Sequence, residues 1–307
     1  MSSSTEPTPQ QLADAPLLKA EGVSITFGGL KALTDFNLAI RKGDLQGLIG
    51  PNGAGKTTAF NVLTGVYKPT QGEVRVGGQK VNTLKPHQIN HLGLARTFQN
   101  IRLFRALTAL DNVKVACRAE AFSDAAAHGV AAAALVRGGV LTAIAANCRT
   151  LVLAGWWKSL LLTPRFQAEE RRITEQAEHL LEVMGLLHRR DEEARNLPYG
   201  EQRRLEIARA LGTQPNVLLL DEPAAGMNTR EKADLMVLIR KLRDDFSLGI
   251  LVIEHDMKLV MGICEKITVL DHGETIARGA PEQVRSDRKV IEAYLGDSYL
   301  ETHGGAA

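Results

Sequence analysis

The stretch Gly50-Pro51-Asn52-Gly53-Ala54-Gly55-Lys56-Thr57 fits the phosphate-binding pattern G-x-x-x-x-G-K-[ST] at every fixed position. The apolar run before it, residues 45–49, is typical of a buried parallel strand, and residues 57–66 have the apolar spacing of a helix. Glycines let several backbone N–H groups converge on phosphate oxygens, and a helix start adds its positive dipole end. Such loops also occur as plain turns. The Lys-Thr pair in this context favours a nucleotide site, in which Lys56 faces the β- and γ-phosphates and Thr57 offers a Mg²⁺ ligand.

Charge and cysteine content limit the class of protein. The 307 residues carry 37 basic and 35 acidic side chains, a net charge of +2, which argues against a dedicated nucleic-acid surface. Cys117, Cys148 and Cys264 are few and widely spaced, which suits a reducing compartment and small packing roles. Residues 1–16 are rich in Ser, Thr, Pro and Gln and lack an apolar core, so we expect a disordered tail and no secretion signal.

Strand-like and helix-like segments alternate along the chain, which predicts a mostly parallel α/β sheet. Residues 17–27 and 35–40 alternate apolar and polar, as half-buried antiparallel strands do. Phe27 ends the first of these strands, where its ring could cover an adenine base or pack as an ordinary core residue. Further strands and helices are expected, with a hairpin at 72–81, strands at 216–220, 249–253 and 266–270, and helices at 108–119, 165–185, 229–245 and 281–295.

Polar residues follow two of these predicted strands and one further short strand-like run. Asp221 and Glu222 follow an apolar run, so Asp221 could hold Mg²⁺ and Glu222 could polarise an attacking water, although such a pair also occurs as a helix cap or a solvated strand end. His255 follows the strand at 249–253, and Gln99 follows a short strand-like run. On its own Gln99 would be an ordinary loop residue.

The segment from residue 125 to 168 has a different character. It contains no acidic residue, and Ala, Val, Leu and the pair Trp156-Trp157 dominate it. Arg137 and Arg149 interrupt the apolar runs before the ~20 residues that a transmembrane helix needs. Two interpretations remain open, a helical extension packed on its own domain or a surface that meets a membrane-embedded partner or the anionic leaflet.

Taken together, these residues resemble the nucleotide-binding subunit of an ABC transporter, from about residue 17 to residue 296. Six motifs stand in that family's order: the phosphate loop Gly50 to Thr58, the Q-loop Gln99, the signature segment Leu197-Pro198-Tyr199-Gly200-Glu201-Gln202, the Walker B run ending in Asp221-Glu222, the D-loop Ala224 to Asn228, and the switch histidine His255.

The resemblance implies a P-loop NTPase fold, α/β with a mostly parallel sheet flanked by helices, an antiparallel β subdomain and an α-helical subdomain. It places the nucleotide-binding domain at 17–296, the helical subdomain at about 100–212, the apolar insert at about 125–164, and tails at 1–16 and 297–307. The insert then lies on the side that faces the membrane subunits in this family.

The same resemblance implies roles for individual residues. The loop amides, Lys56 and Thr58 hold ATP, with Phe27 at the adenine, and Thr57, Asp221 and Gln99 serve Mg²⁺. Glu222 is the general base and His255 contacts the γ-phosphate. The signature segment, residues 197–202, contacts ATP held by a second ATPase subunit, so hydrolysis requires a dimer.

Four runs resemble more narrowly the ATPase subunits of branched-chain amino acid importers: 97–104, 198–209, 253–257 and 291–296. Those subunits work at the cytoplasmic face of the inner membrane with a second ATPase subunit, either a similar chain or a copy, two membrane permeases and an external solute-binding protein. The alternatives are the ATPase of a lipid or polysaccharide exporter, or a non-transport ABC protein acting on ribosomes or DNA. A single phosphate loop and the lack of sustained heptads argue against the last class.

Two positions depart from the family pattern. Pro198 replaces the usual signature serine and has neither a hydroxyl nor an N–H for a γ-phosphate, so we expect a weaker half-site with the Gly200 N–H as the remaining donor. Asn228 replaces the common D-loop aspartate and removes a charge that could help the two sites communicate.

Overall fold

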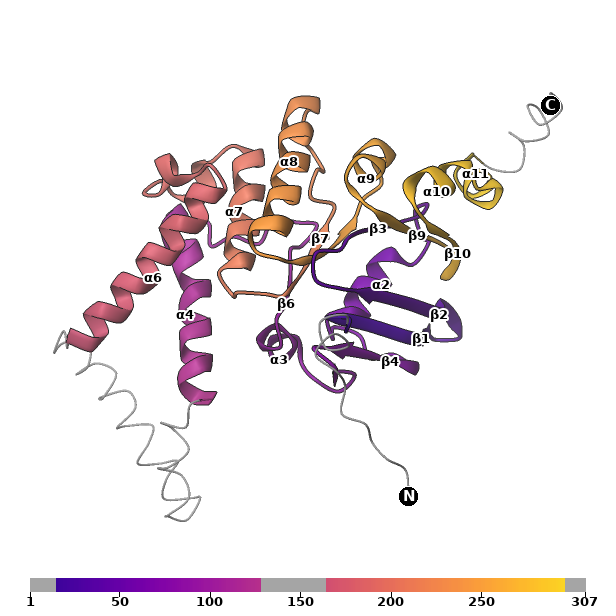
Figure 1. Ribbon diagram of the computed structural model, residues 1–307, viewed down its shortest axis with the longest axis horizontal. Helices are drawn as coiled ribbons and strands as arrows, with labels where there is room; N and C mark the ends of the chain where they lie inside the picture. The colour runs from indigo at the N-terminus through magenta and orange to yellow at the C-terminus, as the bar shows by residue number, and fades with distance from the viewer. Residues whose placement is uncertain (1–14, 128–163, 296–307) are drawn as a thin grey trace, which may run out of the picture. The chain divides into compact units, whose positions relative to one another are not determined.

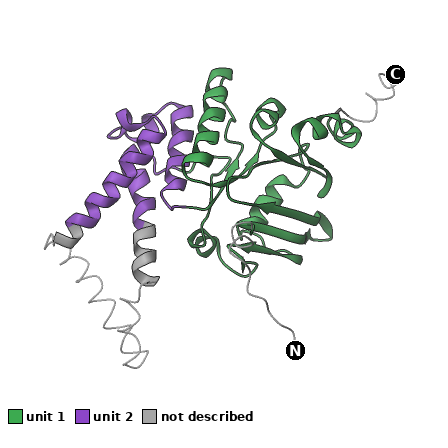
Figure 2. Ribbon diagram, in the orientation of Figure 1, with its two compact units in different colours: residues 1–102, 215–307 green, residues 103–214 purple. Residues whose placement is uncertain are grey.

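The computed structural model describes the backbone of residues 15–127 and 164–295. It divides the chain into two compact units, the first formed by residues 1–102 and 215–307 and the second by residues 103–214 (Figure 2). The predicted apolar insert, including Trp156 and Trp157, lies mostly outside the described residues, as do the two predicted tails almost entirely.

A six-stranded sheet forms the centre of the first unit, in the order β10-β9-β3-β8-β7-β6 (Figure 1). Its strands are β3 (Leu45–Ile49), β6 (Leu94–Arg96), β7 (Val217–Asp221), β8 (Gly249–Ile253), β9 (Lys266–Asp271) and β10 (Glu274–Gly279). Neighbouring strands are parallel except for β10, which pairs antiparallel with β9. Every residue of β3, β7 and β8 is buried, which explains their continuous apolar runs. This sheet confirms the predicted fold class.

A second sheet of the first unit is antiparallel, in the order β2-β1-β4-β5. Its strands are β1 (Leu18–Phe27), β2 (Leu30–Ile40), β4 (Gln71–Val76) and β5 (Gln79–Lys80). The expected start of the second strand at residue 35 is wrong, because β2 already begins at Leu30. Asp35 has a φ of +46°, and the register of β1 and β2 shifts nearby, so the side-chain alternation breaks inside one continuous strand.

Six helices of the first unit are described. They are α2 (Lys56–Leu63), α3 (Pro86–His91), α8 (Thr229–Asp245), α9 (Met257–Ile263), α10 (Pro281–Ser286) and α11 (Arg288–Leu295). Helix α2 lies between the two sheets (Figure 1), and its Phe60 and Leu63 share one buried cluster with Phe36 of β2 and Leu251 of β8. Burying each such side chain contributes roughly 1.5–3 kcal/mol, so this cluster fixes the helix that begins at Lys56.

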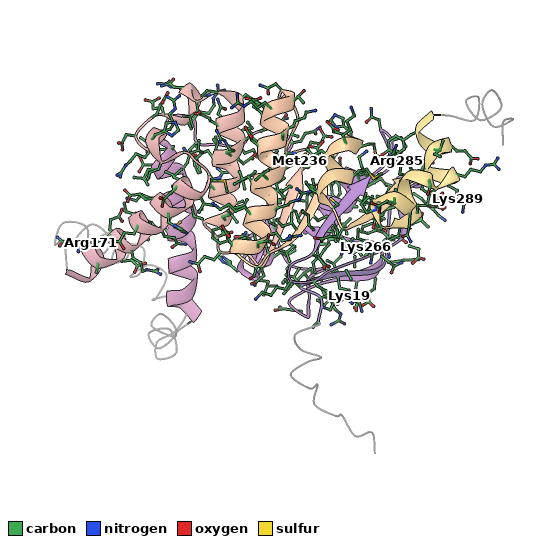
Figure 3. The ribbon with its side chains drawn as sticks, turned by 45° about the horizontal axis from the view of Figure 1, so that its top comes forward. Lys19, Arg171, Met236, Lys266, Arg285 and Lys289 are labelled. Atoms are coloured by element: carbon green, nitrogen blue, oxygen red, sulfur yellow. The ribbon has the colours of Figure 1, made fainter. Side chains whose placement is uncertain are left out.

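Close packing also joins α8 and α9. A Cβ atom at Gly262 of α9 would lie 2.5 Å from the terminal methyl of Met236 of α8, which Figure 3 labels. A larger residue at position 262 would therefore have to displace the end of the Met236 side chain.

The second unit is helical. It contains α4 (Ala109–Ala127), α6 (Pro164–Val183), α7 (Tyr199–Leu211) and two short 3₁₀ segments, Leu187–Arg189 and Ala194–Asn196. Lys114 of α4 pairs with Glu170 of α6 at 2.6 Å. In α7 the fully buried Arg203 pairs with Glu206 at 2.9 Å. Within the described ranges 15–127 and 164–295, no helix is both long and apolar enough to span a bilayer.

Candidate functional site

Three parallel strands bring the phosphate loop and the predicted catalytic residues to one edge of the sheet. Leu48 of β3 and Asp221 of β7 both stand opposite Ile253 of the intervening β8. The three strands therefore end at the same level. β3 leads into the phosphate loop, β7 into Glu222, and β8 into the segment that carries His255. Ligands of open α/β sheets bind at such carboxyl ends.

Glycines shape the phosphate loop where a side chain could not fit. Gly50 has a φ of +153°, and a Cβ there would lie 2.1 Å from the Leu270 carbonyl oxygen. Gly55 has a φ of +98° and caps the N-terminus of α2, where a Cβ would lie 2.8 Å from the Ala32 carbonyl oxygen. The loop can therefore turn sharply into α2 only with glycine at these two positions.

Lys56, the first residue of α2, folds back over the loop. Its Nζ donates to the carbonyl oxygens of Gly50 at 2.7 Å and Pro51 at 2.8 Å. Burial lowers the pKa of Lys56, and the charges of Glu222 and Asp221 act in the opposite direction. The ammonium group is thus held between the loop and the two carboxylates, as a phosphate-binding charge requires.

Asp221, at the end of β7, is almost fully buried and partnered. Its backbone N–H donates to the Thr97 hydroxyl at 3.3 Å, and its Oδ2 lies 3.5 Å from the Arg96 Nη2. Arg96 also donates to Asn61 at 3.0 Å and Thr64 at 2.9 Å in the α2 region. Sequence reasoning missed Arg96, although a lone arginine at the end of a short apolar strand beside Gln99 offered a signal.

Glu222 meets two other predicted catalytic residues. The Gln99 Nε2 donates to its Oε2 at 3.0 Å, and the His255 Nδ1 lies 3.9 Å from the same oxygen. Glu222 itself has a φ of +45°, a conformation that costs a non-glycine residue about 1–3 kcal/mol. Its N–H donates to the Ile253 carbonyl oxygen at 2.9 Å, which helps to hold that conformation. The structure therefore brings Gln99, Glu222 and His255 together.

Phe27 lies at the surface with an aromatic neighbour. Its side chain is 43% exposed, so the alternative reading as a core phenylalanine is wrong. Its ring contacts that of Tyr67 edge to face, with centroids 5.2 Å apart and an interplanar angle of 72°. Sequence reasoning missed Tyr67, which follows α2. The adenine contact of Phe27 stays a prediction.

The D-loop leads directly into a capped helix. Asn228 accepts a hydrogen bond from the Glu231 N–H at 3.0 Å, and the Glu231 carboxylate accepts one from the Asn228 N–H at 2.9 Å. This reciprocal capping box fixes the start of α8. Asparagine therefore keeps the helix cap at this position while lacking the charge of the usual aspartate.

The signature segment belongs to the second unit and opens α7. Pro198 is the N-cap, and its carbonyl oxygen accepts from the Gln202 N–H at 2.9 Å. The Gln202 Nε2 donates to the Leu197 carbonyl oxygen at 2.7 Å, and the Tyr199 side chain is exposed. The segment is thus an ordered helix start without a capping side chain.

The C-terminal helix α11 also reaches the phosphate loop. Burial raises the pKa of Tyr294 to about 12, and the nearby Gly50 backbone lowers it slightly. The Tyr294 hydroxyl lies close to Gly50 without meeting hydrogen-bond geometry. A hollow beside the loop is lined by Pro51 and Asn52 on one side and by Lys289 and Glu292 of α11 on the other (Lys289 is labelled in Figure 3). Sequence reasoning missed this helix as a neighbour of the loop.

Comparison with known proteins agrees with this geometry. Residues 33–225 match the family described as ABC transporter, and residues 274–299 match the one described as branched-chain amino acid ATP-binding cassette transporter. The chain therefore belongs to the ABC transporter family, and it is an ATP-hydrolysing subunit of that family, as predicted.

Individual relatives cover nearly the whole chain. The branched-chain amino acid transport ATP-binding proteins BraF of Pseudomonas aeruginosa and LivG of Escherichia coli are 43% and 42% identical, over 92% of this chain and 99% of each relative. The lipopolysaccharide export ATP-binding protein LptB of Haemophilus influenzae is 31% identical over 92% of this chain and 98% of that protein.

Solved structures show the same fold. The ADP conformation of MJ1267, an ATP-binding cassette of an ABC transporter, is 29% identical with a TM-score of 0.70, and the match covers 92% of this chain and 99% of that one. The dimeric MJ0796 cassette is 24% identical with a TM-score of 0.64, covering 86% of this chain and 98% of that one, which supports the fold alone.

Proposed function

We propose that this chain hydrolyses Mg²⁺–ATP to energise the import of branched-chain or related amino acids. The likeness to BraF and LivG over nearly the full length of both chains carries this proposal. The separate match of residues 274–299 to a branched-chain amino acid family supports it, because this region lies outside the general ABC match.

In this proposal the phosphate loop binds the ATP phosphates through its backbone amides and Lys56. Thr57 and Asp221 are the candidate Mg²⁺ ligands, with the Gln99 carbonyl oxygen as a third. A hydroxyl, a carboxylate and an amide oxygen fit the hard-oxygen preference of Mg²⁺, which commonly combines one or two protein carboxylates with substrate phosphates. When bound, the ion would offset phosphate charge during hydrolysis.

Glu222 is the proposed general base. Its Oε2 accepts a hydrogen bond from the Gln99 Nε2 at 3.0 Å and lies 3.9 Å from the His255 Nδ1. The Gln99 amide therefore orients the carboxylate, and the His255 ring lies beside it. We assign Glu222 to take a proton from the attacking water, Gln99 to hold that water, and His255 to donate to the γ-phosphate.

The partners follow from the same proposal. Membership of the transporter family implies membrane permeases, and the signature segment would complete the site of a second ATPase subunit, either a copy or a similar chain. We further propose two permeases, an external solute-binding protein, and a peripheral position on the cytoplasmic face of the inner membrane.

Purification and reconstitution test the proposal. The tagged chain is purified with its membrane complex, the other subunits are identified, and the complex is reconstituted in proteoliposomes. We expect permeases and a second ATPase, and ATP hydrolysis that rises when binding protein loaded with leucine, isoleucine or valine is added. Stimulation by lipopolysaccharide or another lipid, without any response to amino acids, would favour the exporter alternative instead.

A Glu222→Gln complex is the matched control. We expect it to bind ATP with wild-type affinity but to lose turnover by about 10²–10⁴-fold, because only the base is removed. Full ATPase activity in this complex would contradict the assignment of Glu222.

A further inference from the structure

Glu254, between β8 and His255, is a buried carboxylate without a role in the reaction described above. Its side chain is 1% exposed, and burial raises its pKa. A carboxylate in such surroundings is costly unless hydrogen bonds satisfy its oxygens. What those oxygens bind should therefore explain why the group is there.

Both oxygens accept backbone N–H groups from segments of the hydrolytic site. Oε1 accepts from Ala224 at 2.8 Å, the residue that begins the D-loop. Oε2 accepts from the His255 N–H at 3.3 Å and lies 3.8 Å from the His255 Nδ1. One side chain thus links the loop that follows Glu222 to the segment that carries the histidine.

The other neighbour of the histidine is anchored to the same part of the chain. Asp256 pairs with Lys232 of α8 at 2.7 Å and caps α9 through hydrogen bonds from the Lys258 and Leu259 N–H groups. The His255 ring itself is exposed. Its position therefore depends on the backbone on either side, where Glu254 provides the buried anchor.

We propose that Glu254 is a positioning residue for ATP hydrolysis, whose carboxylate holds His255 beside Glu222 by joining their two loops. Glu254 acts through His255 and does not touch the nucleotide. The inference rests on the role proposed above for His255. Glutamine cannot replace this carboxylate, because it offers one acceptor oxygen and turns an NH₂ group toward the second N–H.

A double-mutant cycle on the assembled transporter tests the proposal. ATPase kinetics are measured for wild type, Glu254→Gln, His255→Ala and the double variant, and ATP affinity is measured for each. We expect Glu254→Gln to lower kcat at least tenfold with KM and ATP affinity within twofold of wild type. We expect no further loss when it is added to His255→Ala, because the two residues act as one unit.

Glu231→Gln is the matched control. Glu231 also accepts a backbone N–H, that of Asn228 at 2.9 Å, at the other end of the D-loop. Glu231→Gln makes the same acid-to-amide change, but among the described residues Glu231 bonds to Asn228 and not to the histidine, so we expect kcat within twofold of wild type.

Two results would overturn the proposal: an unchanged kcat in Glu254→Gln, whatever its KM, or an equal loss of kcat when Glu254→Gln is added to His255→Ala. An unaffected kcat in His255→Ala alone would instead reject the role of the histidine, so the two failures are distinguishable. If Glu254→Gln does not fold, Glu254→Asp replaces it, since it keeps the charge but shortens the reach by one methylene. The proposal then requires the same fall in kcat with unchanged ATP affinity.

Discussion

Gly50→Ala tests the claim that backbone geometry at the first loop glycine shapes the phosphate site. The new Cβ would lie 2.1 Å from the Leu270 carbonyl oxygen, whereas ordinary contact begins at 3.4 Å. That oxygen cannot withdraw freely, because Leu270 belongs to β9 and its neighbour Val269 pairs with Ile49 of β3. Strain from the positive φ costs about 1–3 kcal/mol, and overpacking adds about 1–3 kcal/mol. We expect the free energy of unfolding to fall by about 2–6 kcal/mol.

Gly53→Ala is the matched control within the same loop. Gly53 has a φ of +84°, but a Cβ there would meet no atom within 4 Å. It should cost only the conformational term, about 1–2 kcal/mol. Urea unfolding of both purified variants, followed by circular dichroism, gives the comparison. Equal losses of stability in the two variants would refute the argument that the Leu270 carbonyl excludes a side chain at residue 50.

Four further outcomes are expected. Lys56→Met removes the ammonium that we propose to bind the phosphates, so a fluorescent ATP analogue should bind at least tenfold more weakly in a titration. Phe27→Ala should weaken the same binding by roughly 5–150-fold, since stacking of a base on an aromatic ring is worth about 1–3 kcal/mol; unchanged affinity would remove Phe27 from the adenine site. Pro198→Ser should raise the ATPase rate of the assembled transporter by restoring a hydroxyl donor. The serine would also add a helix cap worth about 0.5–2 kcal/mol of stability, which the lost rigidity of proline, about 0.4–1 kcal/mol, partly offsets. Because the net change in stability is small, an unchanged ATPase rate would count against the weak half-site. Burial raises the pKa of Glu254 in the folded state above its ordinary value of 4.5. Glu254 therefore stabilises the folded state at pH values below 4.5, and this stabilisation is lost as the pH rises through the pKa of the folded state. Urea unfolding at several pH values should therefore show wild type losing stability relative to Glu254→Gln across that window.

The central sheet could be predicted because its strands are buried on both faces. The apolar runs of β3, β7 and β8 are bounded by polar residues, and the expected bounds of 249–253 match those of β8. β10, at Glu274–Gly279, was not identified because it is a half-exposed edge strand with no continuous apolar run. The start of β2 was missed for a different reason, since the irregularity at Asp35 breaks the side-chain period that signals a strand.

The candidate site was predictable where one residue type is chemically required at a fixed spacing. The phosphate loop, Asp221 and Glu222 belong to this kind, because phosphate and metal binding leave few alternatives. The supporting residues were not predictable, since their roles depend on contacts between distant segments. Arg96 reaches Asp221 across 125 positions of sequence, and Glu254 reaches Ala224 across 30. No local pattern records such pairs.

The charges of the site explain why these supporting residues are needed. In the proposed site, Asp221 and Glu222 place two carboxylates where a polyanionic nucleotide would bind, and like charges in a partly buried site repel strongly. Lys56 lies between them and the loop, and Arg96, at the end of the neighbouring strand β6, pairs with Asp221. Burial lowers the pKa of Arg96, so its pairing with Asp221 takes place where water screens little. In the proposed site, a cation that binds with the nucleotide would share the Asp221 carboxylate with Arg96, whose Nη2 lies 3.5 Å from Oδ2. Arg96 therefore orients the carboxylate that we propose as a Mg²⁺ ligand, as supporting residues around metal sites commonly do.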